Sequence, residues 1–208
     1  MVPGGDGRRE FDPEALADRA FLRLLKSVVV PRPIAWVSTR STAGVDNLAP
    51  HSFFTVASET PPILQFTSIG RKDSLRNAVE TGEFVVNLAD LPNFEAVNAS
   101  GTAYPPDEDE FAALGIEREP SVVVAPPRVA GSPVAIECRT EATKEFYDSV
   151  VVFGRVVHLA ISERVLVDGH PEIERLAPLA RLGRNEWSEI GTLHRVDRIP
   201  IDEARRDG

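Results

Sequence analysis

The chain has 208 residues and a formal net charge of −9 at pH 7, from 32 acidic and 23 basic side chains. This acidic balance argues against broad binding to nucleic acid or to anionic membrane surfaces. Its one cysteine, Cys138, excludes an internal disulfide and a thiolate metal cluster.

The N-terminal part is predicted to be a polar arm followed by a helix. Residues 1–12 are polar and rich in glycine, lack an apolar core of signal-peptide type, and are interpreted as a flexible arm. After them, four apolar residues recur at helical spacing and predict a helix over 13–28: Leu16, Ala20, Leu24 and Val28. No apolar run has the length of a membrane span, so we expect a cytoplasmic protein without a membrane partner.

Segments rich in β-branched and aromatic residues predict six strands. They cover 28–40, 47–58, 63–69, 83–89, 132–146 and 149–162. Gly44 marks one of the turns between them, and Pro50 suggests a bulge or a sheet edge. Because turns rather than long helices join most of the strands, we predict a mainly β fold: a mostly antiparallel barrel with peripheral helices.

A helix is predicted between the third and fourth of these strands. Its apolar stripe has helical spacing and consists of Leu75, Ala78 and Val79. Asp73 or Ser74 is suited to be its N-cap, and Gly82 follows its last turn. A second short helix is predicted over 93–101, before an acidic segment at 104–111 that is interpreted as a solvated surface loop.

The motifs of several common enzyme classes do not occur in the sequence. Neither the glycine-rich G-x-G-x-x-G pattern nor a P-loop is present, and a G-x-S-x-G nucleophile elbow is also missing. The four histidines are widely spaced, so we predict no metal site. Cys138 lies in the middle of a predicted strand, which favours a buried structural thiol over a nucleophile. No catalytic residue is assigned.

Residues 67–77, TSIGRKDSLRN, gather cationic and hydroxyl side chains where a strand gives way to a helix. A helix N-terminus carries unpaired N–H groups and a partial positive charge, which suit a phosphate. Arg71, Lys72 and Ser74 are placed to reinforce such a site. The alternative is an N-capped helix with a solvated basic first turn, and Asp73 favours it because its carboxylate can occupy the same N–H groups.

A second group of polar side chains lies on the two strands of a predicted hairpin. Ser38 and Thr39 end one strand, and Asn47 and Ser52 lie on the next. In a hairpin these residues come close to one another near the turn. Polar residues inside apolar strands either cap turns or face a ligand, and the spacing alone leaves both interpretations open.

At these residues the chain resembles the flavin reductase-like, FMN-binding split-barrel family in its longer form. Five segments carry the resemblance in order, across roughly residues 26–190: VVPRPIAWVSTRSTAGVDNLAPHSFFTVASETPP, GRKDSLRNAVETGEFVVNLA, SPVAIEC, VFGRVVHLAI and PLARLG. The resemblance implies a six-stranded split barrel, usually a homodimer, with FMN held near the subunit interface.

The resemblance also implies roles for particular residues. Those expected to line the flavin ring and ribityl chain are Ser38, Thr39, Asn47, Ala49, Pro50, Ser52 and Phe53. Those expected to hold the phosphate are Ser68, Arg71, Lys72 and Ser74, with Asp73 orienting the loop. Arg181 and the stretch through Trp187 resemble the part of the long form that folds over the cofactor.

The sequence departs from the family pattern at two places. Residues 184–187 read RNEW where the family often has a tyrosine, so the covering of the ring can differ. His51 stands where a larger aromatic residue is frequent, and it either touches the flavin or is a hydrogen-bonded histidine of the barrel, the second being favoured. Trp36 is expected in the barrel core or an interface.

The resemblance implies hydride transfer from NADH or NADPH to flavin, and then to an acceptor or a partner oxygenase. We therefore expect an FMN-binding flavin reductase or oxidoreductase, divided into the arm at 1–12, a split-barrel domain at 13–200 and a tail at 201–208. Two alternatives stay open: a flavoprotein oxygenase or the reductase component of a two-component monooxygenase, and a non-catalytic protein that stores or senses FMN. A dimeric barrel that has lost its ligand is the remaining possibility.

Overall fold

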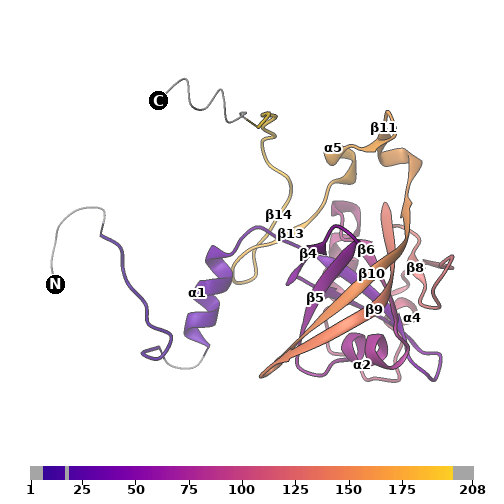
Figure 1. The fold of residues 1–208 in the computed structure, drawn as a ribbon, viewed down its shortest axis with the longest axis horizontal. Helices are drawn as coiled ribbons and strands as arrows, with labels where there is room; N and C mark the ends of the chain where they lie inside the picture. Colours follow the sequence, from indigo (N-terminus) through magenta and orange to yellow (C-terminus); the bar gives the residue numbers. More distant parts are fainter. Residues whose placement is uncertain (1–6, 17–18, 199–208) are drawn as a thin grey trace.

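A seven-stranded antiparallel sheet forms the centre of the molecule (Figure 1). The computed structural model describes residues 7–16 and 19–198. The strand order is β3-β2-β6-β9-β10-β5-β4. The strands are β2 (Ala35–Arg40), β3 (Asp46–His51), β4 (Phe54–Ser58), β5 (Ile63–Ile69), β6 (Glu83–Leu88), β9 (Val134–Phe146) and β10 (Ser149–Ile161). The predicted fold class, mainly β and mostly antiparallel with peripheral helices, is confirmed.

The predicted strand over 47–58 is two strands, which lie at the two opposite edges of the sheet. The chain bends at Ser52 and Phe53, between β3 and β4. The two edges approach there, because the Thr67 N–H donates to the Phe53 carbonyl at 2.9 Å and His51 Nδ1 lies 3.3 Å from the Thr67 carbonyl. The sheet therefore curls back on itself at this bend, and the bend becomes one wall of the site described below.

The predicted strand over 28–40 is also interrupted. Its first residue, Val28, still belongs to a helix, and the strand proper begins after the two prolines, which lack the N–H that a sheet ladder needs. Arg32 and Pro33 form the short strand β1, which pairs with β13 (Ala180–Arg181), and β13 pairs with β14 (Trp187–Ser188). The remaining short strands are β7 (Arg118–Glu119), β8 (Arg128–Val129), β11 (Leu166–Val167) and β12 (His170–Pro171).

Short helices surround the sheet: α1 (Ala20–Val28), α2 (Asp73–Glu80), α3 (Phe94–Ala99), α4 (Glu110–Leu114) and α5 (Ile173–Leu176), with 3-10 turns η1 (Leu91–Asn93) and η2 (Glu163–Val165). In the described residues no helix is both long and apolar enough to cross a membrane. The prediction of a helix from residue 13 was wrong, because the chain first makes a turn closed by the Ala15 N–H and the Asp12 carbonyl. None of the residues of α1 is buried, and Figure 1 shows α1 standing apart from the barrel.

The core has one apolar cluster inside the sheet and a second between the sheet and α3. Phe66 and Phe84 pack edge to face in the first cluster, with ring centroids 5.3 Å apart. Trp36 is fully buried in the second, and its Nε1 donates to Ser100 Oγ at 2.9 Å, so it is a core residue as expected. Cys138 is buried too, and burial raises the pKa of its thiol to about 12. This thiol is therefore protonated at neutral pH, as a structural role requires.

The proposed ends of the domain stay predictions. Residues 7–12 are exposed and carry no regular secondary structure. Residues 1–6 of the predicted arm and the whole predicted tail, 201–208, lie outside the described residues.

Candidate functional site

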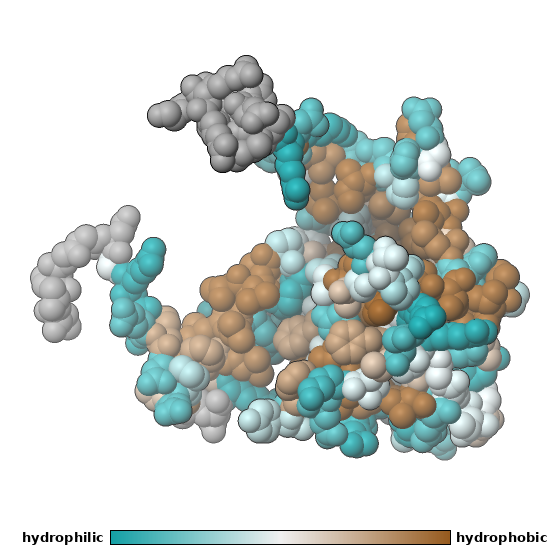
Figure 2. Space-filling model, in the orientation of Figure 1, coloured by the Kyte–Doolittle hydropathy of each residue, from teal (hydrophilic) through white to brown (hydrophobic). Residues whose placement is uncertain are grey.

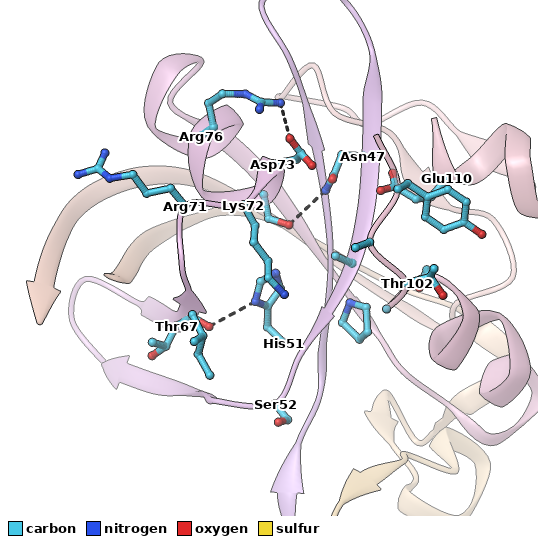
Figure 3. A pocket seen from close by; sticks show the side chains of 18 of the residues that line it. Asn47, His51, Ser52, Thr67, Arg71, Lys72, Asp73, Arg76, Thr102 and Glu110 are labelled. Carbon is cyan, nitrogen blue, oxygen red and sulfur yellow. Dashed lines mark hydrogen bonds and ion pairs between the residues drawn. The ribbon is translucent and has the colours of Figure 1, made fainter. Parts of the chain in front are cut away.

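A cleft of about 450 Å³ opens between β3, the end of β5, the start of α2 and the loop around residues 100–106 (Figure 3). Nine of the residues expected to hold the cofactor line it: Asn47, Ala49, Pro50, Ser52, Phe53, Arg71, Lys72, Asp73 and Ser74. They come from segments far apart in the sequence, which the curl of the sheet brings together. In Figure 3, Ser52 lies at one end of the cleft and the Asp73–Arg76 ion pair at the other.

The first turn of α2 forms the cationic end of the cleft. The helix begins at Asp73, its N-cap residue is Lys72 in an extended conformation, and no side chain caps it. The expectation of Asp73 or Ser74 as N-cap was wrong, because both residues already belong to the helix. The Asp73 carboxylate instead pairs with Arg76 at 2.6 Å. The first N–H groups of α2 therefore keep their capacity to donate to a ligand.

Hydrogen bonds tie α2 to the hairpin of β2 and β3. Asn47 Nδ2 donates to Ser74 Oγ at 3.2 Å, and Asn77 Nδ2 donates to Thr39 Oγ1 at 3.1 Å. Ser74 is buried at the edge of the cleft, and its hydroxyl still has its own proton to donate. These two bonds fix the distance between the start of α2 and the strand that forms the opposite wall.

Three of the expected cofactor residues line neither the cleft nor the hollow that adjoins it. Ser38, Thr39 and Ser68 are fully buried. The Ser38 hydroxyl donates to the Pro127 carbonyl, and the Ser68 hydroxyl donates to the Gly70 carbonyl at 2.8 Å. Thr39 accepts the bond from Asn77. The polar groups of these residues are thus engaged in holding the walls of the cleft together.

Arg181 and Trp187 line an adjoining hollow of about 240 Å³, which shares Pro50, Ser52 and Gly101 with the cleft. The Arg181 guanidinium lies over the Trp187 ring, 4.7 Å from its centroid. Trp187 in turn meets Phe94 edge to face at 5.2 Å. This stacking holds the β13–β14 segment at the end of the cleft where Ser52 lies.

His51 lies in the wall of the cleft with one ring nitrogen satisfied and the other not. Nδ1 faces the Thr67 carbonyl, while Nε2 is buried and has no hydrogen-bond partner among the described residues. Burial above all lowers the pKa of His51 to about 4, and nearby Lys72 lowers it further, against the effect of the Thr67 carbonyl. The ring is therefore neutral at pH 7. With Nδ1–H donating to Thr67, Nε2 presents an acceptor lone pair, so His51 is both a barrel histidine and a residue of the cleft.

The fourth wall of the cleft was not predicted. Thr102, Tyr104 and Glu110 line it, and the acidic segment expected to be a solvated loop is solvated only in part. Asp109 caps α4 by accepting from the Phe111 N–H at 2.9 Å, which turns Glu110 inward. Glu110 Oε2 accepts from the Leu48 N–H at 3.0 Å, and burial raises the pKa of this carboxyl. The only feature of the sequence that indicates this arrangement is Asp109, a suitable N-cap residue directly before Glu110 and Phe111.

The described part of the chain holds no group of three or more histidine, cysteine, aspartate or glutamate side chains suited to a metal ion. The chemistry of the cleft is thus that of an anion-binding helix end, an apolar and hydroxyl-bearing strand wall, and a neutral imidazole.

Comparison with known proteins assigns the chain to a family. The family model for the flavin reductase like domain matches residues 27–176. An uncharacterized protein of Halalkalibacterium halodurans is 38% identical over 208 residues, which cover 94% of this chain and 99% of the relative. Both matches include β1 to β10 and all nine of the expected cofactor residues that line the cleft.

Two solved structures share the fold. Nitrilotriacetate monooxygenase component B from Bacillus cereus aligns with a TM-score of 0.87 and 28% identity, over 92% of this chain and 100% of that chain. A proposed flavin reductase with a split barrel domain from Shewanella frigidimarina aligns with a TM-score of 0.83 and 20% identity, again over 92% and 100%. The sheet that curls back at Ser52 is therefore the split barrel, and the chain belongs to the flavin reductase-like family.

Proposed function

We propose that the protein is an FMN-dependent oxidoreductase, most simply a flavin reductase that takes hydride from NADH or NADPH. The observation that carries the proposal is the uncapped start of α2 beside Lys72, at one end of a cleft of about 450 Å³. Membership of the flavin reductase-like family supports flavin as the ligand.

The residues of the cleft fit FMN. Its volume lies within the range of about 300–1,000 Å³ typical of small-molecule sites. One end offers backbone N–H groups and the Lys72 ammonium to a phosphate. Toward the other end, Pro50 and Phe53 offer apolar surface to a ring, and His51 Nε2 offers an unpartnered acceptor. The carboxylate that competes most directly for the phosphate end, that of Asp73, is neutralised by Arg76.

When bound, FMN supplies the hydride chemistry, and the protein supplies binding, orientation and electrostatics. In this proposal Lys72, Ser74 and the α2 N–H groups hold the phosphate, and the bend at Ser52 and Phe53 holds the ring. Alternate backbone N–H groups of β3 point away from β2. Of these, the Leu48 N–H already donates to Glu110, and Pro50 has no N–H. The next backbone donor on this edge of β3 is therefore the Ser52 N–H. It would stabilise negative charge that collects on the flavin edge on reduction.

Comparison of FMN with riboflavin tests the proposal directly, because riboflavin lacks the phosphate. Two charge-assisted contacts of at least about 1.5 kcal/mol each predict that FMN binds roughly 100-fold more tightly than riboflavin. Quenching of flavin fluorescence on titration with the protein measures both dissociation constants. Equal affinities for the two flavins would show that the α2 end does not hold the phosphate.

A second candidate is the reductase component of a two-component monooxygenase. The similarity to nitrilotriacetate monooxygenase component B, at 28% identity over the full length of that chain, favours it. In that case reduced flavin is handed to a separate oxygenase. Oxygen uptake that depends on both an organic substrate and a partner oxygenase distinguishes this role from that of a reductase acting alone.

We also propose that the protein is a homodimer. Helix α1 has an apolar side with no buried residue, and Leu24 and Val28 are 38% and 73% exposed. Figure 2 shows apolar side chains gathered on α1. A second copy of the chain would cover this surface, since exposed apolar patches of this kind mark contacts between proteins. A monomeric mass in sedimentation equilibrium would overturn the proposal.

A further inference from the structure

Two arginines face each other across the β1–β13 pair. Arg32 and Arg181 are direct cross-strand partners in the antiparallel register. Like charges placed directly opposite destabilise a strand pair. Burial, and after it the charge of Arg181, lowers the pKa of Arg32. In residues 7–16 and 19–198, neither guanidinium belongs to an ion pair. Among these residues, therefore, no carboxylate oxygen lies within 4.0 Å of either guanidinium to neutralise its charge.

Backbone carbonyls hold both guanidiniums in place. Arg32 donates to the Val29 carbonyl at 2.8 Å and to the Leu182 carbonyl at 2.7 Å, and also to the Lys26 carbonyl. Arg181 donates to the carbonyls of residues 184 and 186. The carbonyls at the end of α1 offset only part of this positive charge, because a helix C-terminus carries about half a negative charge. They do not offset two full cationic charges.

Arg32 also has an unsatisfied donor. The residue is only 7% exposed, and its Nε is buried without a hydrogen-bond partner. A buried donor without a partner destabilises the folded protein. Nothing among the described residues accepts from this N–H, and an acceptor that entered beside Arg32, which lines a hollow, would remove this penalty.

The two arginines line hollows that meet at Ser52, at the end of the cleft opposite the start of α2. Arg181 lines the hollow of about 240 Å³ described above. Arg32 lines another of about 400 Å³, whose other walls are mainly apolar: Leu25, Val29, Pro31, Pro33, Phe53 and Phe54. The Arg32 guanidinium also lies 5.9 Å from the centroid of the Phe53 ring. A cationic pair thus stands beside an apolar space next to the proposed position of the flavin ring.

We infer that Arg32 and Arg181 form an oxyanion site for the second substrate, the molecule that exchanges hydride with the flavin. The site takes a carboxylate or phosphate group, and the apolar hollow takes the body of the same molecule. The inference rests on the proposed function and adds the class of substrate. The oxyanion has two chemical sources: a phosphate of the dinucleotide donor, or the carboxylate of an organic acceptor with a flat apolar body.

The test measures dissociation constants of benzoate, NADH and NADPH, with and without bound FMN. Trp187 lies against the Arg181 guanidinium, so tryptophan fluorescence reports binding without any need for catalysis. The Arg181→Met variant removes one charge. The matched control is Arg139→Met, which removes an exposed arginine of β9 that does not line the cleft or either hollow.

A carboxylate source predicts that Arg181→Met weakens benzoate binding at least tenfold and that Arg139→Met changes it less than twofold. A phosphate source predicts the same loss for NADH or NADPH, with benzoate affinity unchanged. Arg181→Lys keeps the charge and should bind the ligand more tightly than Arg181→Met. If Arg181→Met lost affinity only because β13 misfolds, the lysine variant would not recover it. Unchanged constants for all three ligands in Arg181→Met would overturn the inference. Failure of the proposed function is recognised separately, as absence of FMN binding to the wild-type protein.

Discussion

Replacing Lys72 and Ser74 together by alanine is expected to weaken FMN binding by at least about 100-fold. Lys72 is the N-cap residue of α2 and lines the cleft, and the Ser74 hydroxyl lies at its edge with a proton still available. Charge-assisted hydrogen bonds to a phosphate contribute about 1.5–3 kcal/mol each. Two of them correspond to this loss, since each 1.4 kcal/mol is a factor of about ten. Quenching of FMN fluorescence measures the dissociation constant.

Riboflavin and a matched double variant complete this experiment. The affinity for riboflavin should change little in Lys72→Ala/Ser74→Ala, because riboflavin has no phosphate to lose contact with. Lys144→Ala/Ser149→Ala removes the same two residue types from the β9–β10 hairpin, outside the cleft lining. This control should bind FMN like the wild type. FMN affinity unchanged in the first variant, with its circular dichroism spectrum intact, would contradict the phosphate assignment.

Lowering the pH from 7 to 5 is expected to reduce the stability that His51 contributes by about 2 kcal/mol. The pKa of His51 is about 4 in the folded protein, below the ordinary value of about 6.5 that it takes in the unfolded chain. Between these values the unfolded state binds a proton that the folded state does not. The contribution of His51 to stability is therefore complete above about pH 6.5 and is lost as the pH falls toward 4.

Urea denaturation at several pH values, on wild type and His51→Gln, isolates this contribution. Burial raises the pKa of Glu110 and Asp90, so these carboxyls favour the folded state as the pH falls and oppose the effect of His51. The difference between wild type and variant therefore isolates His51 better than the pH dependence of the wild type alone. Between pH 7 and pH 5 the free energy of unfolding of His51→Gln should fall less than that of the wild type. His158→Gln, which removes a half-buried histidine of β10 outside the cleft lining, is the matched substitution with which His51→Gln is compared. An identical slope in His51→Gln would contradict the neutral buried imidazole.

The strands and their antiparallel arrangement could be predicted from the sequence, because alternation and β-branched residues are local signals. The split of 47–58 into two strands at opposite sheet edges could not. It depends on Thr67 pairing with His51 and Phe53 across the barrel, a contact between residues distant in the sequence. The start of α1 was also missed, because Asp12 closes a turn where the apolar spacing favours a helix.

The candidate site was predicted in part. The basic cluster at residues 71–74 and the polar strand residues identified two walls of the cleft. Ser38 and Thr39 were noted as polar strand residues, and the resemblance gave them and Ser68 a cofactor role, but their side chains are used within the protein. Glu110 was missed, because an acidic run is usually solvated and only the tertiary contact with the Leu48 N–H shows otherwise. Arg32 and Arg181 are cross-strand neighbours because β1 pairs with β13, and the Arg32–Leu182 hydrogen bond joins residues 150 positions apart in the sequence. No local pattern predicts such a contact.

The most direct test of the central claim, hydride transfer through FMN in the cleft, is the visible absorption spectrum of the FMN-reconstituted protein on anaerobic addition of NADH and then NADPH. The account predicts that the absorbance of bound oxidised flavin bleaches with at least one of the two donors, and that it returns when an electron acceptor is admitted. Flavin that binds with the predicted affinity but stays oxidised with both donors would contradict the oxidoreductase assignment and favour a protein that stores or senses FMN.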